Sequence, residues 1–446
     1  MYQVRSVRCL LDARNQPLSR EGGHKGCSEP NSISVLDGIW MTNIREALLG
    51  PSYFYHRRLI ERSKLWSAAD IAKYHASRVD PLMKRYGDGV TTKDDYRRDL
   101  GHYTRYNLPV LAHTVRTGGT SGQPLRFSAD TFARRQKERA YLFDIWSGIG
   151  YSPFDLRVRY GGDIHGDDLV QFQRMENVWS ISPAATTESR LDELRSWIGT
   201  VPPFFLHIYP SSLYTFIDLI GEKLFRSLPV RGVMAASETF PAGQQLQFEA
   251  DFGLRIAHWY GHSEYAVLAY YCRDCLGFHF YPTYGKLELL PSDTDGCERV
   301  VATSFNRIGT QFVRYETEDL AVRGAGKCGN NNFPRADAIM GRVQETFRDD
   351  VGRRRSLFGY VFGDLDHGTF WDQIQDLQFI QTAVGKLLVR LIINQGADKD
   401  SIEHTFTERI PMASLEFEYV ASIERSRSGK RRYFLDLTST TRHEIP

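Results

Sequence analysis

A segment rich in glycine and hydroxyl side chains is the most informative chemical feature of the sequence. It lies between two strand-like runs and consists of Thr117, Gly118, Gly119, Thr120, Ser121 and Gly122. Glycine tolerates positive φ angles and has no side chain, so N–H groups and hydroxyls of such a loop can surround a polyanion. Gln123 stands where a Walker A loop has lysine. The composition therefore indicates phosphate binding, with an ordinary solvated turn as the alternative.

Further segments that could do chemistry follow this loop along the chain. They are Ala236, Ser237 and Glu238; Tyr260, Gly261, His262, Ser263 and Glu264; Asp319 after Thr317 and Glu318; Arg342 after Gly341; and Lys430 after Gly429. We expect Glu238 at the carboxyl end of a parallel strand, where open α/β sheets bind ligands, and Asp319 just past a strand ending at Tyr315. Each charged residue alone is as well explained by a surface position. Their common order is the stronger signal.

In this order the segments resemble the motifs of the acyl-adenylate-forming superfamily, the acyl-CoA ligases and adenylation domains. The resemblance is greatest to its phenylacetate–CoA ligase and capsular-polysaccharide-biosynthesis branch, and it runs from about Asn107 to the end. By this resemblance, the loop from Thr117 to Gly122 binds the β- and γ-phosphates of ATP, with Thr117 among the catalytic residues. Ala236, Ser237 and Glu238 would line the adenine and acyl pockets.

The same resemblance implies a role for each remaining motif residue. Tyr260 would stack by the adenine, Ser263 would meet the α-phosphate region with Gly261 and His262 beside it, and Glu264 would hold Mg²⁺. Asp319 would receive the ribose hydroxyls, Arg342 would contact ribose or phosphate, and Lys430 would bridge the attacking carboxylate and the α-phosphate. These roles are chemically reasonable, because Mg²⁺ prefers oxygen ligands and a cation stabilises charge that builds up during in-line attack.

Three positions depart from the superfamily pattern. Gln123 replaces a common lysine, which leaves Arg126 as a candidate for part of that charge. Glu318 replaces a glycine and puts a second carboxylate beside Asp319. The usual hinge aspartate is absent from residues 343–345, so Gln344 or Glu345 is the candidate pivot.

A second group of residues has the composition of a metal site. Cys272, Cys275 and His279 are closely spaced, and Cys328 follows about fifty residues later. Three thiolates and an imidazole are enough for a tetrahedral structural Zn²⁺. Buried cysteines that act as small apolar residues are the alternative.

The elements that must position these residues alternate between strands and helices. Strands are predicted at 156–160, 204–208, 230–236, 254–259, 286–290, 298–303, 311–315, 377–382 and 386–393, and helices at 44–67, 69–86, 131–143, 187–198, 212–224, 242–252 and 399–410. The pattern predicts an α/β fold, with a large N-terminal domain of mixed or parallel sheets plus an antiparallel subdomain at 1–342. Residues 1–106 form an atypical, partly helical lead-in. Residues 343–446 are predicted to be a small mobile α+β lid domain that carries Lys430.

Charge and length exclude some classes of function. Lys and Arg number 56 against 54 Asp and Glu, so the formal net charge of +2 gives no reason to expect binding to nucleic acid or an anionic membrane. No apolar run is long enough to span a bilayer, the first residues do not resemble a signal peptide, and six irregularly spaced cysteines do not suggest a disulfide framework. We expect a cytoplasmic protein, for which a homodimer is one possible state.

The leading functional hypothesis is an AMP-forming ligase. ATP and a carboxylic acid would give an acyl-adenylate and pyrophosphate, and the acyl group would then pass to coenzyme A. Tyr209, Tyr214, Phe240 and Trp259 suit an aryl or arylacetic acid, although aromatic residues are as often core. One alternative passes the acyl or adenylyl group to an amine, sugar, hydroxyl or carrier protein. Another alternative is a catalytically degenerate member that acts as a binding or scaffolding subunit.

Overall fold

The computed structural model describes residues 49–105, 112–116, 125–131, 133–161, 168–183, 185–240, 243–294, 296–306, 308–326, 328–342, 346–357, 373–424 and 433–438. The predicted phosphate loop at 117–122 and the predicted catalytic Lys430 lie outside these residues, as does the side chain of Arg342.

A twelve-stranded sheet forms the framework, with strand order β12-β13-β15-β16-β11-β10-β9-β8-β7-β4-β6-β5. The block from β6 to β9 is entirely parallel, and β5 joins its edge in antiparallel fashion. Its strands are β4 (Arg157–Tyr160), β5 (Val170–Gln173), β6 (Val178–Ile181), β7 (Phe204–Ile208), β8 (Val230–Ala236) and β9 (Ile256–Gly261). Nearly continuous apolar runs in β7 and β8 fit strands that are covered on both faces.

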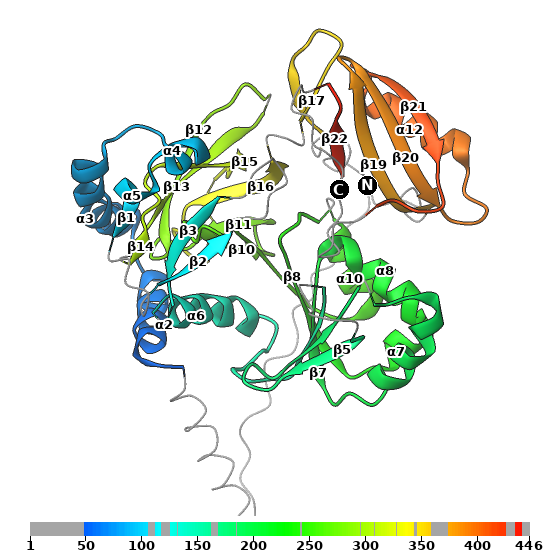
Figure 1. The fold of residues 1–446 in the computed structure, drawn as a ribbon, viewed down its shortest axis with the longest axis horizontal. Helices are drawn as coiled ribbons and strands as arrows, with labels where there is room; N and C mark the ends of the chain where they lie inside the picture. Colours follow the sequence, from blue (N-terminus) through cyan, green and yellow to red (C-terminus); the bar gives the residue numbers. More distant parts are fainter. Residues whose placement is uncertain are drawn as a thin grey trace, which may run out of the picture. The chain divides into compact units, whose positions relative to one another are not determined.

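Helices cover both faces of this parallel block (Figure 1). One face packs against α2 (Pro51–Ser63) and α6 (Ala133–Ser147), and the other packs against α7 (Leu191–Ile198), α8 (Pro210–Ile220), α9 (Glu222–Ser227) and α10 (Gln244–Phe252). A short 3₁₀ turn, Glu188–Arg190, precedes α7. The single helix predicted at 212–224 is wrong in one respect, because Gly221 has a φ of 90° that ends α8 and starts α9.

The antiparallel strands continue the same sheet. They are β10 (Leu268–Cys272), β11 (Gly277–Phe280), β12 (Gly285–Pro291), β13 (Glu298–Ser304), β15 (Tyr315–Arg323) and β16 (Arg335–Arg342). The pairing of β9 with β10 joins the two halves. The prediction that Asp319 follows a strand is wrong, since Asp319 lies inside β15 and pairs with Arg342 of β16.

A smaller sheet of order β1-β14-β3-β2 carries the ends of the predicted phosphate loop. Its strands are β1 (Thr104–Arg105), β2 (Ala112–Arg116), β3 (Arg126–Asp130) and β14 (Gly309–Thr310). Arg116 pairs with Arg126, so the segment between them connects two antiparallel strands.

The lead-in consists of α2, α3 (Ala68–Tyr86), α4 (Lys93–Arg98) and α5 (Leu100–Tyr103). Two long helices were expected there from the periodicity. Ser67 and Asp70 form a capping box that starts α3 and separates it from α2. None of the described helices is both long enough and apolar enough to cross a membrane.

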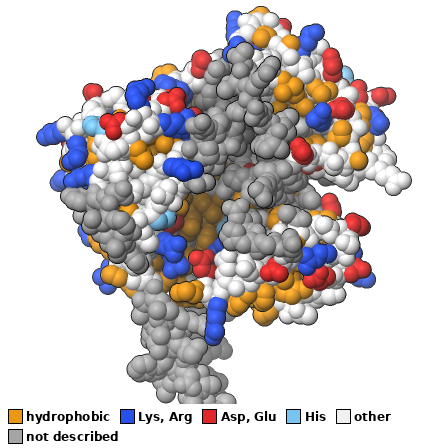
Figure 2. All heavy atoms as spheres, in the orientation of Figure 1, with side chains coloured by type: hydrophobic (Ala, Val, Ile, Leu, Met, Phe, Trp, Pro, Cys, Tyr) orange, Lys and Arg blue, Asp and Glu red, His pale blue; other side chains and the backbone are white. Residues whose placement is uncertain are grey.

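The C-terminal region has its own α+β core. It contains β17 (Thr346–Arg348), β18 (Arg354–Ser356), and a sheet of order β21-β20-β19-β22 made of β19 (Ile374–Ala383), β20 (Lys386–Ile393), β21 (Ser414–Tyr419) and β22 (Phe434–Asp436), with helix α12 (Lys399–Arg409). Phe379, Val389 and Phe406 are fully buried in that core. Acidic and basic side chains are interspersed on the described surface in Figure 2, as the near-zero net charge predicts. The predicted α/β fold class is confirmed.

Candidate active site

Glu264 is a buried carboxylate held by two neighbours. It follows β9, and its side chain is 8% exposed. Tyr315 donates its hydroxyl to Oε1 at 2.9 Å, and Nδ1 of His262 lies 3.1 Å from Oε2. Burial alone would raise the pKa of Glu264, but the bonds from His262 and Tyr315 outweigh it and lower the pKa to about 2. Glu264 is therefore ionised at neutral pH, as a magnesium ligand must be.

Asp319 lies on the same strand as Tyr315 and contacts Tyr260. The Tyr260 hydroxyl donates to Oδ2 of Asp319 at 2.6 Å, and Asp319 is 9% exposed. Its pairing with Arg342 brings the backbone of that residue alongside. The structure therefore brings together residues from three of the motifs that the sequence singled out: Tyr260 contacts Asp319, Asp319 pairs with Arg342, and Glu264 contacts Tyr315 on the strand of Asp319.

The segment after β8 reaches the same edge of the sheet. β8 ends at Ala236, which pairs with Trp259 of β9, so Ser237 lies next to the strand that carries Tyr260. Ser237 has a φ of 71°, a conformation that non-glycine residues rarely adopt. Tyr265 and Glu318 share this property with φ values of 55° and 66°. Backbone strain of this kind concentrates at functional sites.

The strand after the predicted phosphate loop lies beside Glu264. A narrow pocket is lined by residues of β3 together with Glu264, Tyr265 and Asn306, and the lining also includes Ile308 and Thr310. Arg126, the first residue of β3, is exposed. β3, the strand that follows the predicted phosphate loop in sequence, therefore lies beside the ionised carboxylate of Glu264.

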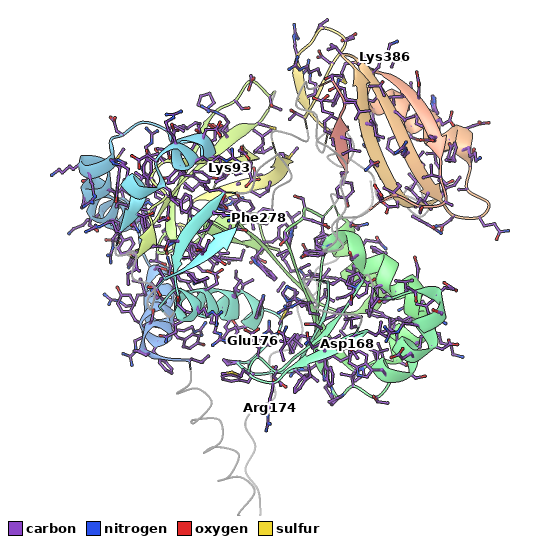
Figure 3. All side chains as sticks on the ribbon, viewed as in Figure 1. Lys93, Asp168, Arg174, Glu176, Phe278 and Lys386 are labelled. Carbon is purple, nitrogen blue, oxygen red and sulfur yellow. The ribbon has the colours of Figure 1, made fainter. Side chains whose placement is uncertain are left out.

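The lead-in contributes a residue that sequence reasoning missed. Lys93, labelled in Figure 3, begins α4, and its side chain is 8% exposed. Its Nζ lies 2.6 Å from Oε2 of Glu318. Thr91 anchors this helix, since its N–H donates to Arg314 O and its carbonyl accepts from Glu316 N. Lys93 thus supplies a positive charge to the additional carboxylate that departs from the superfamily pattern.

We expect Lys93 and Glu318 to be energetically coupled. A double-mutant cycle of Lys93→Met and Glu318→Gln, measured by urea unfolding, should give a coupling free energy of about 1–2 kcal/mol, because Lys93 is buried and Glu318 is only partly exposed. The exposed pair Arg97 and Asp94 is the control and should give less than about 0.5 kcal/mol. Equal coupling free energies in both cycles would show that the pair of Lys93 and Glu318 contributes no more than an exposed surface ion pair.

The four predicted zinc ligands also lie together. The candidate ligand atoms of Cys272, Cys275, His279 and Cys328 are all within 4.8 Å of one another. The two sulfurs of Cys272 and Cys328 are 3.9 Å apart, and Cys275 Sγ is 3.2 Å from His279 Nε2. Tetrahedral Zn²⁺ with bonds of about 2.0–2.3 Å separates its ligands by roughly these distances.

Neighbouring amides orient this cluster. Asn331 Oδ1 lies 2.9 Å from His279 Nδ1, while its Nδ2 donates to the Tyr270 hydroxyl at 2.8 Å. The amide oxygen therefore accepts a hydrogen from Nδ1, which directs Nε2 toward the thiols. Metal-binding histidines commonly have such a partner.

Comparison with solved structures identifies the class of fold. A 2-hydroxyisobutyryl-CoA ligase in the postadenylation state, in complex with R3-HIB-AMP, is 14% identical with a TM-score of 0.59, covering 84% of this chain and 88% of that one. The same ligase in complex with 2-HIB-AMP is 15% identical with a TM-score of 0.57, covering 91% of this chain and 89% of that one. An acyl acid amido synthetase in complex with 2,4-DB is 12% identical with a TM-score of 0.52, covering 82% of this chain and 89% of that one. The protein has the fold of the acyl-adenylate-forming enzymes, as its motifs predicted.

The C-terminal region matches one family model. Residues 367–436 match the family model of the CapK C-terminal domain. This match agrees with the resemblance to the capsular-polysaccharide-biosynthesis branch. A search of curated protein sequences gives no match.

Proposed function

We propose that this protein activates a carboxylic acid with ATP to form an acyl-adenylate. The arrangement of Glu264 and Asp319 carries the proposal. Two tyrosines hold these buried carboxylates. Tyr260 at the end of β9 bonds Asp319 of β15, and Tyr315 of β15 bonds Glu264, which lies beside the strand that follows the glycine-rich loop. Asp319 suits ribose hydroxyls, and ionised Glu264 suits a hard dication. Mg²⁺ bound there would neutralise charge on the ATP phosphates.

In the proposed first step, a carboxylate oxygen of the acid attacks the α-phosphorus of ATP. A new P–O bond forms, the bond to the β-phosphate oxygen breaks, and pyrophosphate leaves. Backbone and hydroxyl groups of residues 117–122 would bind the phosphates, and Lys430 would neutralise charge on the acid and the α-phosphate. Ala236, Ser237 and Glu238 would shape the adenine and acyl pockets.

Coenzyme A is our proposed acyl acceptor. Its thiolate would attack the acyl carbon, and AMP would leave with the electron pair of the cleaved C–O bond. The fold is shared with a CoA ligase and also with an amido synthetase, and the C-terminal match is to CapK. Transfer to an amine, sugar, hydroxyl or carrier protein is therefore the second candidate.

Acid-dependent pyrophosphate exchange tests the first step. Purified protein with ATP, Mg²⁺ and labelled pyrophosphate should form labelled ATP when a suitable acid is present and not without it. Adding coenzyme A should then yield a thioester and release AMP. Exchange without thioester would favour the second candidate, whereas no exchange across a broad panel of acids would favour a binding subunit.

We also propose that Cys272, Cys275, His279 and Cys328 bind a structural Zn²⁺. Four ligand atoms of the right chemistry converge, and Asn331 fixes the orientation of the histidine. The residues would leave no open position for substrate, so the metal would hold the β10–β11 hairpin to the segment around Cys328.

A further inference from the structure

A cluster of basic and polar side chains lies between α6 and the parallel strands. Arg159 of β4 pairs directly with Ser180 of β6 on one side and His207 of β7 on the other, so these three side chains share one face of the sheet. Arg157 lies two residues before Arg159 on the same face, with its guanidinium over the Trp146 ring of α6 at 5.1 Å. We call Trp146, Arg157, Arg159, Ser180 and His207 the β4 cluster.

The β4 cluster contains several polar atoms without a partner. Trp146 Nε1, Arg157 Nε, Arg159 Nε, Ser180 Oγ and His207 Nδ1 are buried, and none has a hydrogen-bond partner in the described part of the chain. Buried polar groups are nearly always paired, because each unpaired one costs about 1–3 kcal/mol. Five such atoms in one place indicate a ligand rather than five separate defects.

The charge of this region indicates what kind of ligand it is. Arg139 of α6, Arg157 and Arg159 all approach the carboxylate of Glu176, at 3.8, 3.7 and 4.0 Å. Figure 3 places Glu176 in the region between α6 and β5. Within the described residues Glu176 is the acidic partner of these three arginines, and its side chain is 43% exposed. Burial and the two neighbouring arginines lower the pKa of His207, so it adds no positive charge. Bound water could satisfy hydrogen bonds but could not balance the excess of positive charge among these described side chains.

The position of the β4 cluster connects it to the candidate active site. The His207 and Trp146 rings both contact the Trp259 ring, at 5.7 Å each. Trp259 directly precedes Tyr260 and pairs with Ala236, which directly precedes Ser237. Because Ala236 and Trp259 share one face of the sheet, the β4 cluster lies one aromatic side chain away from Ala236, a residue proposed to line the adenine and acyl pockets.

We propose that the acid substrate carries a second anionic group, such as another carboxylate, and that Arg157 and Arg159 of the β4 cluster bind it. This inference rests on the proposed function. The carboxylate to be activated would lie near Ser237 and Glu264, and the indoles of Trp146 and Trp259 would contact an apolar or aryl spacer. Arginine is well suited to this role, because its planar group binds carboxylates in bidentate fashion.

Matched pairs of acids test the proposal. Pyrophosphate exchange is measured with phenylacetate against 4-carboxyphenylacetate and with hexanoate against adipate. We expect kcat/KM to be at least about tenfold higher for each diacid. Arg159→Met should lower kcat/KM for the diacids about tenfold or more and change the value for the monoacids less than about twofold. Arg159→Lys should restore part of the preference.

Arg231→Met is the matched control. Arg231 belongs to β8 but pairs with Asp155, and its side chain is 44% exposed, so the diacid preference should be unchanged. Thermal unfolding of each variant separates lost folding from lost selectivity. Wild-type protein that exchanges monoacids as well as diacids would overturn the inference while leaving the proposed function intact.

Calorimetry without ATP provides a readout that does not depend on catalysis. If no acid supports exchange, the proposed function fails. Binding of a diacid to wild-type protein that is lost in Arg159→Met would still support the anionic subsite. Absence of diacid binding in wild-type protein would overturn it.

Discussion

Glu264→Gln is expected to lower acid-dependent pyrophosphate exchange by at least about 100-fold. Glutamine keeps the size of the side chain and an oxygen that can accept the Tyr315 hydroxyl, but it removes the negative charge that would hold Mg²⁺. The measurement is the exchange rate at saturating acid and increasing Mg²⁺. The variant should need much more Mg²⁺, since one carboxylate plus ATP oxygens is a minimal magnesium site.

Glu316→Gln is the matched control for this prediction. Glu316 lies next to Tyr315 on β15 but points to the other face, where Arg299 binds both of its carboxylate oxygens at 3.1 Å. Its exchange rate should stay within about twofold of wild type. Wild-type exchange in Glu264→Gln, with unchanged magnesium dependence, would show that Glu264 is only a structural carboxylate.

Acid unfolding provides a second comparison between Glu264→Gln and the wild-type protein. The pKa of Glu264 is lowered from 4.5 to about 2 in the folded state. A lowered pKa stabilises the fold above pH 4.5, and this contribution is lost as the pH falls from 4.5 toward 2. Glu264→Gln lacks that contribution, so its stability deficit relative to wild type should shrink over this pH range.

The order of elements and the position of several site residues could be predicted from sequence. The strand at 230–236 and the strand at 386–393 have the predicted bounds, because continuous or alternating apolar residues mark them clearly. The strand predicted at 311–315 is wrong, because it overlaps β15 only at Tyr315; Glu316, Thr317, Glu318 and Asp319 have no apolar pattern that would mark β15. Hydrogen bonding to β13 and β16 stabilises that strand instead.

Lys93 and the arginines of the β4 cluster depend on contacts that no local pattern encodes. Lys93 and Glu318 are 225 residues apart in sequence, and the charge pair exists only because Thr91 pairs with the start of β15. Arg157 and Arg159 alternate with apolar residues, which is typical of a strand with one solvated face. Packing of α6 against that face buries Arg157 and the Nε atoms of both arginines, so their significance appears only in three dimensions.

Removal of the proposed zinc is expected to lower the thermal stability of the protein substantially. Purified protein should contain about one Zn²⁺ per chain, and Cys328→Ser should lose the metal and lower the unfolding temperature by about 5–10 °C. The reason is geometric, because Cys328 is the ligand that joins the β10–β11 hairpin to the segment before β16. Cys297→Ser, in a separate apolar cluster with Leu320 and Met340, should keep the metal.

Asn331→Ala distinguishes a metal site from a cluster of buried cysteines. It leaves all four ligands in place but removes the acceptor of the His279 Nδ1 hydrogen, so zinc affinity in a chelator competition should fall about 10- to 100-fold. A cysteine cluster without metal would show no zinc to lose, and Cys328→Ser would then unfold at nearly the wild-type temperature. β16 pairs with both β11 and β15, so loss of zinc should loosen the strand next to Asp319. The zinc-free protein should therefore lose pyrophosphate exchange activity at a lower temperature than the zinc-bound protein.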